Sequence, residues 1–248
     1  MTGVLPSGVV LLTDRLVARG GLERVVAGAV AQGVRWVVLR EKDLPRAERA
    51  ALAVDLRAIL ADAGGTLVVA GPDPLGGDAV HLPAAGPYPP PALPLVGRSC
   101  HSVPELNRLT TEHYATVSPV WPTSTKPGYG PPLQVDGLRK LIEASPVPVL
   151  ALGGVETPEQ VTACVEAGAA GVAVLGALMR AEDPRVAAQL LTSAFQEAVT
   201  PERFIAGGLA PCPPGSVLGP TLPPLVSGVP ARSGHGRPQP QTATKEAT

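Results

Sequence analysis

Short apolar runs and longer amphipathic segments alternate along the first 200 residues of the chain. The short runs are rich in Val and Leu with little polar alternation, which is typical of parallel strands buried on both faces. The longer segments repeat Ala, Leu and Arg at helical spacing. The pattern predicts strands over residues 9–12, 34–39, 66–70, 79–82, 95–99, 114–117, 147–152 and 171–175. It predicts helices over residues 22–32, 46–63, 103–110, 135–144, 158–167 and 184–199.

Strands that alternate with helices predict an α/β protein with a parallel sheet. Eight strands fit a closed (β/α)8 TIM barrel, for which about 200 residues is near the lower limit. A doubly wound open sheet is the structural alternative. The pair Gly153-Gly154 follows the seventh predicted strand. It favours the barrel, because phosphate commonly binds near strands seven and eight of such barrels.

Two connections and the end of the chain depart from this pattern. Residues 71–78 are too short and too rich in Gly and Pro for a full helix, and residues 83–94 contain six prolines. We therefore expect reduced helices after strands three and four. From residue 201 the chain has 10 prolines and 7 glycines in 48 residues, a composition typical of disorder. The expected organisation is a barrel domain over residues 1–200 and a disordered tail over residues 201–248.

The composition fits a globular protein with a sizeable core, at 45% hydrophobic and 17% charged residues. The formal net charge of −1 argues against nucleic acid or an anionic membrane surface as a partner. Cys100, Cys164 and Cys212 are widely spaced and form no zinc-binding pattern, so we expect free thiols in the cytoplasm. No run reaches the ~20 apolar residues of a membrane span. A homodimer stays open.

Positive charge and glycine turns mark one end of the predicted strands. Side chains alternate along a strand, so Arg40 and Lys42 at the end of strand two share one face. Two cations on an inward face need an anion or a carboxylate to compensate them; otherwise Arg40 pairs with a neighbouring carboxylate and Lys42 is solvated. After strands seven and eight, turns at Gly153-Gly154 and Gly176 allow the backbone to approach an oxyanion closely.

A loop and a histidine add polar chemistry at the same end. Residues 119–135, PVWPTSTKPGYGPPLQV, carry hydroxyls and one ammonium group in a Pro- and Gly-rich loop that suits an anion. His101 ends strand five, and its unperturbed pKa of about 6.5 suits reversible proton transfer. The alternative is a buried, hydrogen-bonded histidine. His81 also ends a strand, and Cys100 is expected to point into the outer layer as a packing residue.

These motifs together resemble the thiamine phosphate synthase and TenI family. The loop of residues 119–135 resembles the loop after the family's sixth strand, and REKD at residues 40–43 resembles its strand-two motif. GRSCHS at residues 97–102 resembles the TenI branch. The resemblance implies a (β/α)8 barrel that acts on a thiazole phosphate, with His101 as the catalytic acid and base. It implies substrate or phosphate contacts from Arg40, Lys42, Ser99, Thr123, Thr125, Lys126, Gly153, Gly154, Leu175 and Gly176.

The chain departs from the synthase pattern where the family binds Mg²⁺. Thiamine phosphate synthases join a pyrimidine diphosphate to a thiazole phosphate, with an Asn-Asp pair at the end of strand three and an Asp after strand four. This chain has Ala70-Gly71 and the run Leu82-Pro83-Ala84-Ala85 in those places. We therefore expect no metal cofactor and a TenI-like isomerase, which converts a carboxythiazole phosphate to its aromatic tautomer.

Two alternatives stay open. The first is a divergent Mg²⁺-dependent synthase, a transferase that joins hydroxymethylpyrimidine diphosphate and thiazole phosphate. The second is a non-catalytic barrel that binds thiazole phosphate or has a regulatory role. All three hypotheses place the chain in thiamine biosynthesis.

Overall fold

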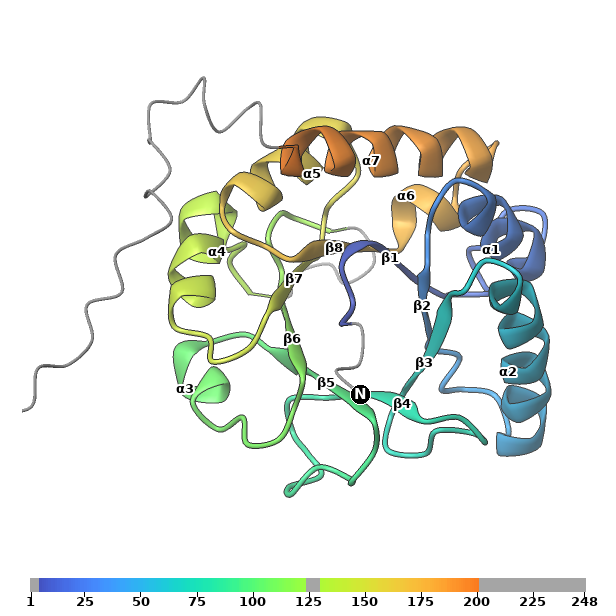
Figure 1. Ribbon diagram of the computed structural model, residues 1–248, viewed down its shortest axis with the longest axis horizontal. Helices are drawn as coiled ribbons and strands as arrows, with labels where there is room; N and C mark the ends of the chain where they lie inside the picture. Colours follow the sequence, from blue (N-terminus) through green and yellow to red (C-terminus); the bar gives the residue numbers. More distant parts are fainter. Residues whose placement is uncertain (1–4, 124–129, 201–248) are drawn as a thin grey trace, which may run out of the picture. The chain divides into compact units, whose positions relative to one another are not determined.

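The computed structural model describes residues 5–123 and 130–200, which form a closed barrel of parallel strands (Figure 1). Neighbouring strands pair in chain order, and β8 closes the barrel against β1. The predicted TIM barrel is confirmed, and the open sheet is excluded. The strands are β1 (Gly8–Leu12), β2 (Trp36–Leu39), β3 (Thr66–Ala70), β4 (Ala79–Leu82), β5 (Leu95–Cys100), β6 (Tyr114–Val117), β7 (Val149–Leu152) and β8 (Gly171–Val174).

The strands lack polar alternation because both faces of the sheet are covered. Leu11 of β1 pairs in register with Val37 of β2, and Val37 pairs with Leu67 of β3. Leu11 and Val37 are fully buried. Small and branched aliphatic side chains fill the barrel and the layer beneath the helices, which suits a chain with only 3% aromatic residues.

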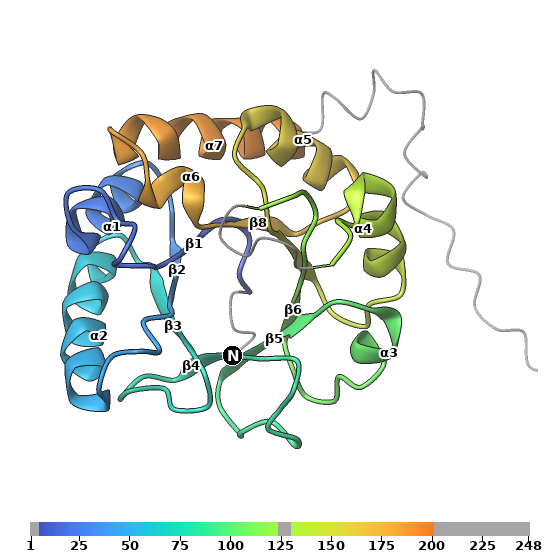
Figure 2. The same ribbon diagram turned by 180° about the vertical axis from the view of Figure 1, so that it is seen from behind.

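The helices surround the barrel on most of its circumference (Figure 2). Thr157 starts α5 with a capping box, because its hydroxyl accepts from the Gln160 N–H and the Gln160 side chain accepts from the Thr157 N–H. The Asp183 carboxylate caps α7 by accepting from the N–H groups of Arg185 and Val186. The helices are α1 (Leu22–Ala31), α2 (Arg46–Ala61), α3 (Val103–Leu106), α4 (Gln134–Glu143), α5 (Pro158–Glu166), α6 (Gly176–Met179) and α7 (Pro184–Val199).

Two helices differ from the prediction. The helix expected over residues 103–110 ends at Leu106, because the N–H groups of Arg108 and Leu109 bond to carbonyls three residues earlier and tighten the last turns. The short helix α6 was not predicted, since its four residues, GALM, are too few to show helical periodicity.

The predicted loss of helices after strands three and four is confirmed. Residues 71–78 and 83–94 contain no helix, and loops cover this part of the barrel, at the bottom of Figure 1. Leu93 packs on a small separate apolar cluster of Val80, Leu82 and Val96. A loop side chain thus covers the outer face of β4 and β5, where a helix would pack in a complete barrel.

The predicted disordered tail, residues 201–248, lies outside the described residues, so the division into two regions stays a prediction. Cys100 and Cys164 are buried free thiols, as expected. Among the described helices, none has the length and hydropathy needed to cross a membrane.

Candidate active site

A cavity of about 910 Å³ opens at the carboxyl ends of the strands, and every strand contributes to its lining. Its volume is typical of sites for small molecules, which are ~300–1,000 Å³. Catalytic sites of TIM barrels lie at this end. The predicted site residues that line the cavity are Arg40, Lys42, Ser99, His101, Thr123, Gly153, Gly154, Leu175 and Gly176. Thr125 and Lys126 lie outside the described residues.

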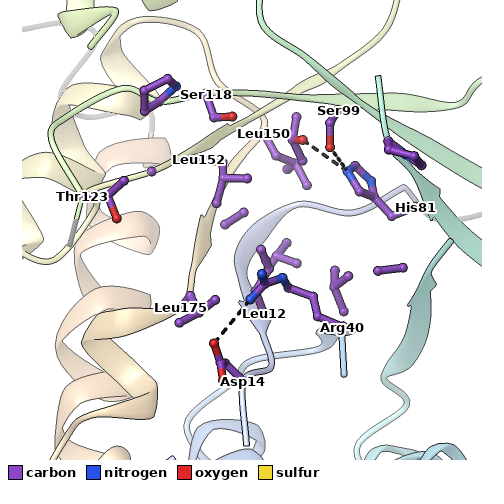
Figure 3. A pocket seen from close by; sticks show the side chains of 18 of the residues that line it. Leu12, Asp14, Arg40, His81, Ser99, Ser118, Thr123, Leu150, Leu152 and Leu175 are labelled. Atoms are coloured by element: carbon purple, nitrogen blue, oxygen red, sulfur yellow. Dashed lines mark hydrogen bonds and ion pairs between the residues drawn. The ribbon is translucent and has the colours of Figure 1, made fainter. Parts of the chain in front are cut away.

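Both polar and apolar side chains line the cavity (Figure 3). His81, Ser99 and Thr116, from β4, β5 and β6, form the polar wall and contact one another. The apolar wall comes from β1, β7 and β8 and the turn after β8, through Leu12, Leu150, Leu152, Ala173 and Leu175. A ligand with an apolar face and a polar edge, such as a heteroaromatic ring, fits this division.

His101 is held by a hydrogen bond from its ring and another from its backbone N–H. Its Nδ1 lies 2.9 Å from the carbonyl oxygen of Ser118, which can only accept, so Nδ1 carries a proton. Nε2 is therefore the basic atom of the neutral ring. The N–H group of His101 donates to the Glu105 carboxylate in α3. Sequence reasoning missed Ser118 and Glu105, although Ser118 lies at the end of a strand and Glu105 in the first turn of a helix.

Cys100 is not a nucleophile of this site. It is fully buried between Ser99 and His101, does not line the cavity, and burial raises the pKa of its thiol to about 12. The alternation of side chains along β5 thus confirms the packing role predicted for it.

Arg40 lies at the mouth of the cavity beside a carboxylate. One guanidinium nitrogen is 3.8 Å from Asp14 Oδ2, and the side chain is 31% exposed. The backbone N–H of Arg40 donates to the Thr13 hydroxyl at 2.9 Å, which fixes the end of β2 against β1. The alternative considered from the sequence, a neighbouring carboxylate, is therefore present, and Arg40 offers an anion only part of its charge.

The two glycines after β7 have positive φ angles, 96° at Gly153 and 71° at Gly154. A Cβ at Gly154 would lie 2.5 Å from the Pro122 carbonyl oxygen and 2.7 Å from Trp121 Cβ. The Trp121 N–H donates to the Gly153 carbonyl at 3.0 Å. Glycine is thus required here because the loop after β6 packs directly on the turn, a reason that the sequence did not reveal.

The residues at the ends of β3 and β4 do not fit Mg²⁺. Mg²⁺ requires a near-octahedral shell of oxygen ligands, usually with carboxylates, and Ala70, Pro83 and Ala84 supply none. Arg49 instead donates to the carbonyl oxygens of Leu39 at 3.1 Å and Ala70 at 2.5 Å. A guanidinium therefore lies at the ends of β2 and β3, where it would repel a divalent cation.

Several acidic side chains around the cavity already form ion pairs with arginines. Glu41 and Asp43 both accept from Arg15, which lowers the pKa of Asp43. Glu156 pairs with Arg180 at 3.0 Å. Across residues 5–123 and 130–200, no three His, Cys, Asp or Glu side chains gather as a metal site would require.

The comparisons with known proteins agree on one family. A family model described as "Thiamine monophosphate synthase" (TMP-TENI) matches residues 9–178. The chain is 36% identical over 192 residues to a thiamine-phosphate synthase of Albidiferax ferrireducens, covering 72% of this chain and 87% of the relative. It is 34% identical over 197 residues to that of Methanoculleus marisnigri, covering 73% and 92%.

A solved structure shares the fold. The thiamine phosphate pyrophosphorylase from Pyrococcus furiosus matches with a TM-score of 0.68 at 24% identity, covering 78% of this chain and 97% of that one. The family predicted from the sequence is confirmed, whereas its TenI branch is not distinguished. The relatives carry the name of the transferase, so the comparisons favour the synthase alternative over the tautomerase that the sequence led us to expect.

Proposed function

The chain belongs to the thiamine monophosphate synthase family, and from this premise we propose that it is an enzyme that binds a thiazole phosphate in thiamine biosynthesis. The phosphate would lie by Gly154, Leu175 and Gly176, which line the cavity at the turns after β7 and β8. Arg40 and Lys42 line the same cavity and add positive charge.

The geometry best supports a proton transfer, the tautomerisation of a carboxythiazole phosphate. The observation that carries this proposal is the orientation of His101, whose Nδ1 lies 2.9 Å from the Ser118 carbonyl oxygen while the ring lines the cavity. That hydrogen bond fixes the tautomer, so that in the proposed reaction Nε2 would exchange protons with the substrate.

The reaction would need no oxidant and no second substrate. Nε2 of His101 takes a proton from the non-aromatic thiazole ring, and the electron pair of the broken bond moves into the ring. The same nitrogen then returns the proton to another substrate atom and leaves the aromatic tautomer. In between, the Ser118 carbonyl accepts a hydrogen bond from the cationic imidazole, and Arg40 offsets the negative charge on the substrate.

The second candidate is the transferase, and the names of the relatives favour it. It would join thiazole phosphate to a pyrimidine diphosphate and release diphosphate. The hydroxyl of Thr123 lines the cavity and could bind an anionic oxygen there. Against this candidate stand the neutral residues at the ends of β3 and β4 and the Arg49 guanidinium beside them.

One assay in two arms separates the candidates. The first arm holds the protein, carboxythiazole phosphate and EDTA in D₂O, and NMR follows the tautomer ratio and deuterium uptake. The second holds thiazole phosphate, hydroxymethylpyrimidine diphosphate and Mg²⁺, and follows diphosphate release. Turnover in the first arm alone is expected. Turnover only in the second would establish the transferase, and binding without turnover in either would indicate a non-catalytic barrel.

A further inference from the structure

A hydrogen-bond chain crosses the polar wall of the cavity. The Tyr114 hydroxyl lies 3.1 Å from His81 Nδ1, and the Ser99 hydroxyl lies 3.0 Å from His81 Nε2. The Thr116 hydroxyl is 3.3 Å from the same Nε2. All four side chains line the cavity, and Figure 3 shows His81 beside Ser99.

Gly97 leaves the space that the tyrosine of this hydrogen-bond chain occupies. A Cβ at Gly97 of β5 would lie 2.1 Å from Cζ of Tyr114. The Tyr114 ring therefore occupies the space that a side chain at position 97 would need. It stacks on His81 with ring centroids 5.5 Å apart and an interplanar angle of 29°. Since any larger residue at position 97 would displace the ring, the placement of Tyr114 follows directly from this sequence.

The surroundings of Tyr114 determine which atoms of the hydrogen-bond chain donate and which accept. Tyr114 is only 1% exposed, and His81 Nδ1 is the one acceptor that its hydroxyl has within the described residues. A buried hydroxyl without an acceptor is costly, so the Tyr114 O–H donates and Nδ1 accepts. A neutral imidazole then carries its proton on Nε2 and donates it to Ser99, which at 3.0 Å is nearer than Thr116 at 3.3 Å. Since Ser99 accepts from His81, its own proton is directed to a ligand.

His81 suits this role because it stays neutral. Burial, with the nearby positive charges of Lys42 and Arg98, lowers its pKa to about 3. At neutral pH its ring therefore offers one donor and one acceptor, as a directed chain requires. A histidine that titrated near neutral pH would lose the acceptor for Tyr114 when it gained a proton.

We propose that His81 is a positioning residue that directs the Ser99 hydroxyl to donate to a hydrogen-bond acceptor on the substrate ring. This inference rests on the proposed binding of a thiazole phosphate. It gives the two histidines of the cavity different tasks: His101 exchanges a proton with the substrate, and His81 orders a neighbouring hydroxyl. His81 transfers no proton to the substrate in this scheme.

The test measures the dissociation constant of thiazole phosphate by calorimetry, so that it does not depend on turnover. Ser99→Ala should weaken binding about tenfold, because a buried donor to the ligand is lost. Ser99→Thr, which keeps a hydroxyl, should stay within about threefold of the wild type. Tyr114→Phe should weaken binding by about three- to tenfold, because Nδ1 loses its donor and the direction of the chain is no longer fixed.

The coupling between the two positions is the decisive measurement. Tyr114→Phe in the Ser99→Ala background should weaken binding no further, because the chain then has no hydroxyl to direct. Tyr88→Phe is the matched control: its hydroxyl bonds to the Ala84 carbonyl at 3.1 Å and does not line the cavity, so binding should be unchanged.

The outcomes separate this inference from the proposed function. A wild-type protein that fails to bind thiazole phosphate would overturn the proposed function. A wild-type protein that binds, with Ser99→Ala binding equally well or with additive effects of the two substitutions, would overturn the role of His81 alone. Should Tyr114→Phe fail to fold, His81→Gln takes its place in the same double-substitution cycle, and additive effects with Ser99→Ala would overturn the role of His81.

Discussion

The two sides of the barrel end are built differently. On the side of β7 and β8, α5 and α7 cover the sheet, and the Gly153-Gly154 turn packs against the loop after β6. On the side of β3 and β4, loops replace the helices, and arginines donate to backbone carbonyls of a strand end and of the loops: Arg49 to Ala70, Arg57 to Leu75 and Arg98 to Pro83. The arginines on this second side therefore stabilise the fold.

The two sides of the cavity therefore differ in the kind of ligand group that they suit. The β7–β8 side keeps a compact turn that suits a phosphate, and the apolar wall lies beside it. On the β3–β4 side, Ala70 and Ala84 line the cavity without a carboxylate to hold a metal, and guanidinium groups bond to nearby backbone carbonyls. On the proposed function, we therefore expect the chain to bind a thiazole phosphate more readily than a metal diphosphate.

The largest effect is expected at the residue between the two sides. His101→Asn should lower the rate of tautomerisation by ~10²–10⁴-fold, since asparagine keeps a hydrogen bond but cannot carry the proton. The dissociation constant of thiazole phosphate should stay within a few fold. NMR in D₂O measures the rate and calorimetry the binding. His81→Gln is the control, and its effect should be on binding. A near-normal rate for His101→Asn would remove histidine from the chemistry.

The second prediction concerns the arginines of the β3–β4 side. Arg98 and Glu112 form an ion pair with both side chains fully buried. Burial alone would raise the pKa of Glu112, but hydrogen bonds from the Thr110 N–H and from Arg98 hold it below its usual value. Arg98→Met should therefore destabilise the protein by about 3–5 kcal/mol, because it leaves a buried carboxylate unpaired.

Urea unfolding followed by circular dichroism measures this effect. Adding Glu112→Gln to Arg98→Met should recover part of the loss, since no buried charge then remains. Arg46→Met is the matched control, because its ion pair with Asp73 is exposed and should contribute under about 1 kcal/mol. An Arg98→Met variant as stable as the wild type would show that the loops hold without the guanidinium.

The third prediction uses the pKa of His81. Folding lowers it from about 6.5 to about 3, so the unfolded chain binds the extra proton between these values and stability falls as the pH drops through this window. Between pH 7 and pH 5 the wild type should lose ~1–2 kcal/mol more than His81→Gln. Urea unfolding at both pH values gives the difference between the two proteins, in which the contributions of groups that both proteins share cancel. Equal losses would mean that His81 titrates normally in the fold.

The sequence predicted the barrel because each strand is an unbroken apolar run and each missing helix is marked by Gly and Pro. It placed His101 and the glycine turns at the cavity because they follow strands directly. It could not show that Gly154 is required by the loop after β6, since that contact joins residues about 30 positions apart. The Tyr114–His81–Ser99 chain was missed for the same reason: its members lie on three strands, and only the closed barrel brings them together.

The smallest effect is expected from metal removal, where the comparison of the two sides is tested most directly. A calorimetric titration of Mg²⁺ without diphosphate should show no site tighter than millimolar, because Ala70 and Ala84 offer no carboxylate and Arg49 places a positive charge beside them. EDTA should likewise leave the tautomerisation rate unchanged.

A stoichiometric Mg²⁺ site of micromolar affinity, with activity lost in EDTA, would contradict this prediction. It would mean that other carboxylates of the cavity leave their arginine partners to bind the metal. Glu41 and Asp43 would be the first to examine, because both now accept from Arg15 at the mouth of the cavity. Such a site would return the chain to the transferase that its relatives are named for.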